Sequence, residues 1–95
     1  MPRYHFHCVD GSRIPDYDGM SLPDLATARQ EAVRFAGEVL QSEPALLWQK
    51  GQWRVEVTGE DGVLLFTLVT LAIDAPQPSA VRSHQTEPPG ASNTA

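Results

Sequence analysis

The sequence contains a single cysteine, Cys8, among its 95 residues. One cysteine excludes an intrachain disulfide, so packing and hydrogen bonds have to hold the fold together. The opening residues, Met-Pro-Arg-Tyr-His-Phe-His, also lack the uninterrupted apolar stretch of a secretory signal. We therefore expect a cytoplasmic protein.

Basic residues and long hydrophobic runs are scarce as well. Seven Lys and Arg residues oppose twelve Asp and Glu residues, and the basic ones are scattered along the chain. Proteins that bind nucleic acid through its phosphates need clustered basic side chains, so we expect no such partner. The most apolar segment, residues 63–73, is shorter than the roughly 20 residues that span a bilayer, so we expect no membrane contact.

The chain divides by composition into a body and a tail. Residues 76–95 are rich in Pro, Ser and Thr and show no hydrophobic periodicity. Such a segment cannot bury enough apolar area to offset the entropy of ordering it. We predict a small domain over residues 1–75 and a disordered tail over residues 76–95.

The first part of the body has the pattern of a β-hairpin. Residues 4–9 alternate between two faces, with Tyr4, Phe6 and Cys8 on one of them. Asp10-Gly11 suits a two-residue type I′ turn, and residues 12–14 form the returning strand.

A helix is predicted next, over about residues 22–42. Ser21 supplies an N-cap hydroxyl and Pro23 lies in the first turn, while Pro44 ends the helix. The apolar residues recur at helical spacing and form one stripe: Leu25, Ala28, Ala32, Phe35 and Val39.

The second part returns to a period of two. Trp53, Val55 and Val57 alternate with polar residues, a Gly-Glu-Asp-Gly turn follows at residues 59–62, and residues 63–73 form a long strand. Residues 45–52, with Leu46, Leu47 and Trp48, are too apolar for a plain linker and should cover one end of the core. The predicted fold is α+β with the order β-β-α-β-β, an antiparallel sheet of three to four strands with one helix on a face. The apolar last strand should be central or should contact something on both faces.

His5 and His7 are the first candidates for chemistry, because their spacing places both rings on one face of a strand. They could share a metal ion or act as acid and base in an enzyme. A stable site needs three or four ligands, and the nearest additions are Asp16, Asp18 and Glu56. We favour the interpretation that both histidines pack beside cross-strand partners, and we assign no cofactor and no catalytic residue.

Other candidates also have a structural interpretation. Cys8 could be a nucleophile, but the alternation directs it towards the core. The aspartates of residues 10–18 suggest a calcium loop, yet Pro15 interrupts them and the EF-hand spacing is absent. Trp48 and Trp53 could stack on a ligand, although core or interface packing suits them better in a chain without a basic groove.

The last strand is the candidate interface. One helix covers only one face of a sheet, so half of the apolar side chains of this strand should remain exposed. The exposed set is either Leu64, Phe66 and Leu68 or Val63, Leu65 and Val69, and we choose Leu64, Phe66 and Leu68 as the interface. The favoured function is a non-enzymatic interaction or regulatory module whose partner is another protein or, in a homodimer, a second copy.

Several motifs occur together in a fixed order. After the opening motif come Asp10-Gly11, Leu22-Pro23-Asp24, Ala-Arg-Gln-Glu-Ala at residues 28–32 and Asp-Gly-Val-Leu at residues 61–64. The combination resembles short bacterial proteins that open M-P-x-Y-x-F-H-x-x-D-G, and it covers most of residues 1–65. That resemblance implies a family without an assigned activity, cofactor or catalytic residue.

A weaker likeness concerns the helix. Pro23-Asp24-Leu25 and Glu31-Ala32 are similar to motifs of small antitoxins that neutralise RNA-cleaving toxins. This likeness implies a small toxin as the partner.

Overall fold

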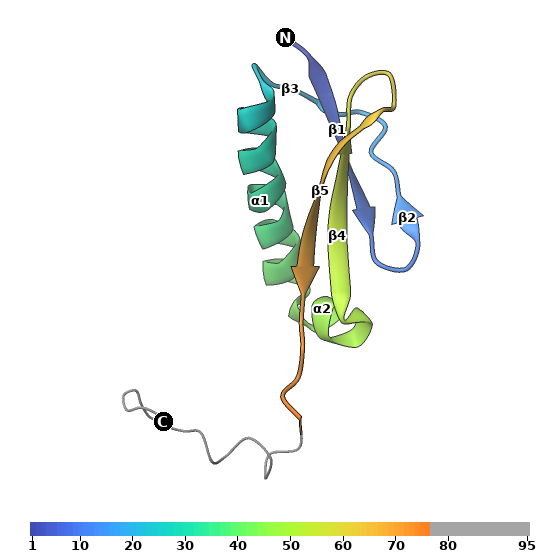
Figure 1. The fold of residues 1–95 in the computed structure, drawn as a ribbon, viewed down its shortest axis with the longest axis vertical. Coiled ribbons are helices and arrows are strands. Elements are labelled where there is room, and N and C mark those ends of the chain that lie inside the picture. Colours follow the sequence, from blue (N-terminus) through green and yellow to red (C-terminus); the bar gives the residue numbers. More distant parts are fainter. Residues whose placement is uncertain (77–95) are drawn as a thin grey trace, which may run out of the picture.

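The computed structural model describes residues 1–76, so all of the predicted tail except its first residue lies outside the described part of the chain. An antiparallel sheet forms one layer and a long helix, α1, packs on one of its faces (Figure 1). The strand order is β2-β1-β4-β5, and β3 pairs with β1 as well. The predicted α+β class and the β-β-α-β-β order are confirmed.

The first hairpin joins β1 (Arg3–Val9) to β2 (Arg13–Ile14). Val9 pairs with Arg13, which leaves three residues in the connection. Gly11 has a φ of +113°, a backbone conformation that glycine adopts at no steric cost. The hairpin is therefore confirmed, whereas the two-residue turn is wrong by one residue.

A short strand that the sequence did not reveal, β3 (Met20–Ser21), pairs with the start of β1. The Leu22 N–H continues this attachment by donating to the carbonyl of Pro2 at 3.0 Å. Ser21 is thus held in the sheet and cannot cap the helix. Asp24 is the N-cap instead, and its Oδ1 accepts from the backbone N–H of Thr27 at 2.8 Å.

Helix α1 (Leu25–Ser42) therefore begins about one turn later than predicted and ends where predicted. Its buried residues are the alanines Ala28, Ala32 and Ala36. Small side chains allow the helix axis to approach the sheet closely, while the larger residues of the stripe, such as Phe35, pack beside the contact. The ring of Phe35 lies 6.2 Å from that of Trp53 between centroids.

The apolar connector forms a second, short helix, α2 (Pro44–Lys50). It lies at one end of the sheet, next to the end of α1 (Figure 1). Leu46 and Leu47 pack against the core, as predicted for this segment. Trp48 points away and is 60% exposed.

Strand β4 (Gln52–Thr58) is the middle of the sheet, and Trp53, Val55 and Val57 are its fully buried residues. Among the described residues, strand β5 (Leu64–Leu71) pairs only with β4 and is an edge strand. The prediction that the last strand is central is therefore wrong, and the alternative that it contacts something on both faces stays a prediction. The near-continuous apolar pattern does not distinguish a central strand from an edge strand with unusually apolar faces.

No helix within residues 1–76 is long and apolar enough to cross a bilayer.

Candidate functional site

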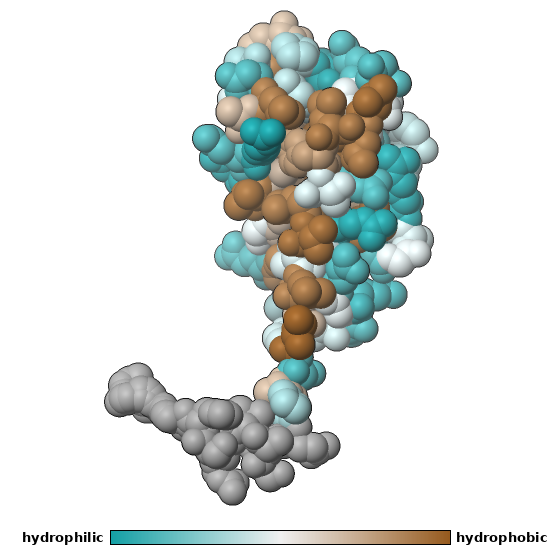
Figure 2. Space-filling model, in the orientation of Figure 1, coloured by the Kyte–Doolittle hydropathy of each residue, from teal (hydrophilic) through white to brown (hydrophobic). Residues whose placement is uncertain are grey.

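The β5 edge carries the largest group of exposed apolar side chains in the described part of the chain. Figure 2 shows them as a hydrophobic band that follows β5 and its flanking residues. The band contains no charged residue between positions 63 and 73. Its exposed members are Val63, Leu64, Leu65, Val69, Leu71 and Ile73. We call this feature the β5 edge.

The register between β4 and β5 shows which face each residue occupies. Phe66 pairs with Val57 and Leu68 pairs with Val55, so both share the face that α1 covers. They are half-buried and pack against the core. Val69 pairs with Arg54 on the uncovered face and is exposed.

The predicted interface residues are therefore divided between two environments. Leu64 is exposed and pairs with Thr58 beyond the register shift, but Phe66 and Leu68 point towards α1. The exposed residues that the register places on the uncovered face are Val69 and Leu71, and Leu65, at the register shift, is exposed without a partner in β4. The interface role of Leu64, Phe66 and Leu68 stays a prediction. The exposed apolar side chains on the uncovered face of β5 also belong to the candidate interface.

The opposite edge of the sheet is closed. β3 and β2 cover the two ends of β1, and between them the side chain of Asp16 takes the place of a strand. Its Oδ2 accepts from the backbone N–H of Phe6 at 3.1 Å, in the middle of β1. Its Oδ1 accepts from the N–H groups of Asp18 and Gly19 at 3.2 and 3.1 Å, which fixes the loop after it.

These hydrogen bonds also set the charge of Asp16. Partial burial raises its pKa, but the N–H donors of Gly19, Phe6 and Asp18, together with the nearby His5, outweigh burial. The pKa of Asp16 is lowered below its ordinary value of 3.8. The carboxylate is thus ionised at neutral pH, where a charged acceptor makes the stronger hydrogen bonds.

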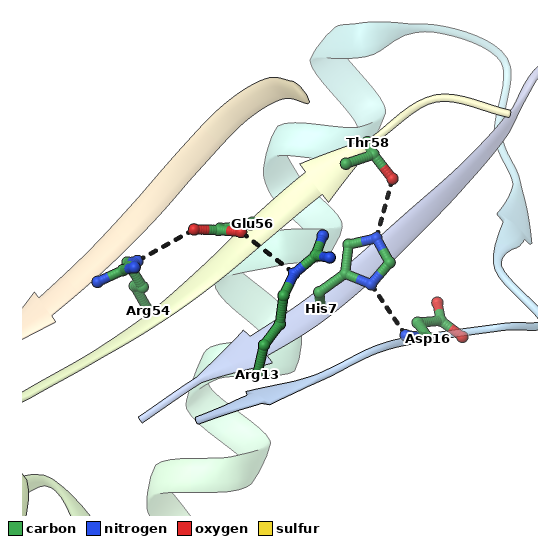
Figure 3. A network of polar contacts seen from close by, with 6 residues as sticks. All are labelled: His7, Arg13, Asp16, Arg54, Glu56 and Thr58. Carbon is green, nitrogen blue, oxygen red and sulfur yellow. Dashed lines mark hydrogen bonds and ion pairs between the residues drawn. The ribbon is translucent and has the colours of Figure 1, made fainter. Parts of the chain in front are cut away.

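His7 is buried and holds the same loop (Figure 3). The Asp16 backbone N–H donates to His7 Nδ1 at 2.9 Å, so Nδ1 carries no proton. Nε2 is then the protonated nitrogen and donates to Thr58 Oγ1 at 2.9 Å. Burial first, and then the positive charge of Arg13, lower the pKa of His7 below 6.5, against the opposing effects of Asp16 and Glu56. His7 is a neutral structural histidine that joins β1, β4 and the loop.

His5 also attaches the loop at Asp16 to β1. Its Nδ1 lies 2.9 Å from the carbonyl oxygen of Asp16 and donates to it, because a carbonyl only accepts. The rings of His5 and His7 stack with centroids 6.2 Å apart. We call Asp16 together with these two histidines the loop clamp.

The loop clamp leaves little for a metal ion. Both ring nitrogens of His7 and one of His5 are already in hydrogen bonds. Glu56, one of the proposed additional ligands, instead lies between Arg13 at 3.4 Å and Arg54 at 3.2 Å (Figure 3). Within residues 1–76 no group of three or more His, Cys, Asp or Glu residues is placed to hold a metal. These hydrogen bonds agree with the interpretation that both histidines pack against neighbouring segments.

Cys8 lies on the other face of β1 from the histidines, as its alternation predicts. It is half-buried and lines a pocket of about 370 Å³ between α1 and the β1–β2 edge, together with Phe6, Ile14 and Phe35. Burial first, then the negative charges of Asp10 and Asp16, raise the pKa of the Cys8 thiol. A raised pKa disfavours the nucleophilic thiolate, so the site does not activate this cysteine.

Sequence reasoning missed the central role of Asp16. An aspartate that follows a proline and precedes a glycine by three residues signals a turn, and the hydrogen bonds that Asp16 accepts from Asp18 and Gly19 are of that kind. The bond from Phe6, ten residues earlier, depends on how the loop folds back over β1.

Comparison with known proteins gives one result. No curated protein and no solved structure matches the chain. The family described as "Domain of unknown function (DUF6894)" matches residues 3–72, a span that contains every strand and helix given above. The resemblance to a family without an assigned activity is confirmed, and the chain belongs to this DUF6894 family.

Proposed function

We propose that this domain is a non-enzymatic protein-interaction module that acts as a homodimer, joined through the β5 edge. The observation that carries the proposal is the exposed apolar edge strand. An edge strand presents a row of unpaired N–H and C=O groups that another strand can pair with. Apolar side chains beside that row supply the driving force, because burying each half-exposed residue contributes about 1 kcal/mol.

Within residues 1–76, the β5 edge has little of the usual protection of an edge. Natural edge strands are shortened, carry lysine or proline, are twisted by β-bulges, or are covered by a loop. β5 has eight residues, and residues 63–73 contain neither a charge nor a proline. Its one irregularity is a register shift opposite Val57 and Thr58, at the start of the strand.

A second copy of the chain fits this edge better than a charged partner. The whole chain has a formal net charge of −5, yet the β5 edge is uncharged. Two copies therefore meet without placing like charges opposite one another, and burial of the apolar band needs no complementary charge. A symmetric dimer uses the same patch on both subunits.

The test is the mass of the full chain in sedimentation velocity, from low to high micromolar concentration. We expect a species of twice the monomer mass that dissociates on dilution. Val69→Lys, which places a charge on the exposed face of β5, should give a monomer. Val33→Lys is the matched control, because Val33 is equally apolar and exposed but lies on α1. A monomer at every concentration, or equal effects of the two substitutions, would contradict the proposal.

A further inference from the structure

We propose that the two β5 strands of the dimer pair antiparallel about a two-fold axis that passes beside Thr67. This inference rests on the proposed function, and it specifies the register of that interface. It follows from the alternation of β5 and from the chemistry of the residues that would lie opposite one another.

The alternation of side chains along β5 requires the two-fold axis to pass beside a residue and not between two residues. Along a strand, both the side-chain face and the direction of the hydrogen-bonding groups repeat every second residue. Two directly opposite residues of an antiparallel pair have their side chains on the same face, and their N–H and C=O groups point either towards each other or away from each other in both residues. A residue can therefore oppose only itself or a residue an even number of positions away. A residue of one copy therefore lies opposite the same residue of the other.

The ends of the strand leave two central choices. β5 spans Leu64–Leu71, so pairing along most of its length requires Thr67 or Leu68 at the axis. An axis at Leu68 would place Thr67 opposite Val69 and Phe66 opposite Thr70. Each of these pairs would place a threonine hydroxyl opposite an apolar side chain.

An axis at Thr67 matches the side chains better. Within the regular part of β5, which begins at Phe66, Thr67 then opposes Thr67 and Phe66 opposes Leu68. Thr–Thr pairs and apolar pairs are the cross-strand combinations that stabilise sheets. Val69 and Thr70 lie opposite the register shift of the other copy, at Leu65 and Leu64.

This register covers both faces of β5 at once. On the helix face, the half-buried Phe66 and Leu68 of the two copies meet and connect the two cores. On the other face, the two Thr67 side chains meet, and the exposed Val69 of each copy lies beside them, opposite the register shift of the other copy. A two-fold axis perpendicular to the sheet keeps both α1 helices on the same side, so the dimer has one continuous sheet with one uncovered face.

Cysteine cross-linking tests the register in the full chain with Cys8→Ala, which removes the native thiol. At the axis, the Cα atoms of opposite residues are about 4.5–5.5 Å apart, within the range that a disulfide bridges. Thr67→Cys should therefore form a disulfide-linked dimer under mild oxidation. Leu68→Cys is the matched control, because its two copies would be diagonal neighbours about 7–8 Å apart and should remain at least about tenfold less cross-linked.

Each other outcome has a distinct meaning. Efficient cross-linking of Leu68→Cys without Thr67→Cys overturns the register in favour of an axis at Leu68. A dimer in sedimentation that neither cysteine cross-links overturns strand pairing through β5 while leaving the dimer intact. A wild-type monomer refutes the proposed function itself. Thr67→Cys replaces an exposed side chain, and its sedimentation mass before oxidation shows whether the variant still dimerises.

Discussion

The two edges of the sheet are built in opposite ways. At one edge, two very short strands and the carboxylate of Asp16 occupy the hydrogen-bonding groups of β1. At the other edge, the outer side of β5, a long, uncharged and apolar strand, pairs with no other described strand. Within residues 1–76, β5 is therefore the long strand to which another strand can add, whereas β2, at the opposite end of the sheet, has two residues.

The largest expected effect comes from opening the closed edge. Asp16→Ala removes three backbone partners and leaves the Phe6 N–H without its acceptor, so we expect a loss of about 2–4 kcal/mol in the free energy of unfolding. Urea denaturation measures it. Asp18→Ala is the control, since the Asp18 side chain is exposed, and should cost less than about 0.5 kcal/mol. Similar losses for the two variants would show that Asp16 does not close the edge.

Gly19 provides a sharper test of the loop clamp. Its φ is +72°, and a Cβ there would lie 2.9 Å from the ring of His5 and from the Arg3 side chain. Gly62 has a φ of +81° but open space around it. Both alanine variants should lose about 1 kcal/mol in the free energy of unfolding, because alanine disfavours a positive φ. Gly19→Ala should lose about 1 kcal/mol more, because its Cβ also meets His5 and Arg3, and thermal or urea unfolding measures the difference. The prediction fails if Gly62→Ala is as destabilising as Gly19→Ala.

The closed edge should also weaken in mild acid. The folded pKa of His7 is lowered below its ordinary value of 6.5, so below that pH the unfolded chain binds a proton that the folded chain does not. The stabilising effect of the neutral His7 ring is therefore present in full above pH 6.5. It is lost as the pH falls towards the folded pKa, and the loss is about 1.4 kcal/mol for each pH unit by which the fold lowers this pKa. Unfolding measured across this window should show the slope, and His7→Gln should remove the part due to His7. An unchanged slope in His7→Gln would assign it to other groups.

The smallest effect concerns salt at the open edge. The β5 edge is uncharged but each chain carries a formal charge of −5, so the two copies repel one another at long range. Added salt screens that repulsion, and the dimer should become a few-fold tighter between low and physiological ionic strength. Sedimentation equilibrium at two salt concentrations measures the change. A dimer that weakens in salt would point to ion pairs across the interface.

Local signals account for most of the fold. Alternation in β1 and β4, helical spacing in α1 and the prolines of the connector all act within a few residues, and the elements they predict are present. The start of α1 is the exception, because it lies about one turn after the predicted start. Both Ser21 and Asp24 suit an N-cap, and the choice between them depends on the pairing of β3 with β1. Apolarity marked residues 63–73 as a candidate interface, but their place at an edge follows from β4 pairing with β1, a contact between distant segments.

That distant contact also has a kinetic consequence. The β4–β5 hairpin forms from neighbouring residues, whereas β1 reaches β4 only across a long loop, with His7 bonded to Thr58 51 residues away. Pairing between segments distant in the sequence is slower than pairing within a hairpin, because the entropy of loop closure is lost before the contacts form. We therefore expect β1 to dock late, and until it docks, β4 has a free edge as well as β5, so that both sides of the hairpin can pair with other chains. On this expectation, docking of β1 and formation of the loop clamp protect the folding chain from aggregation.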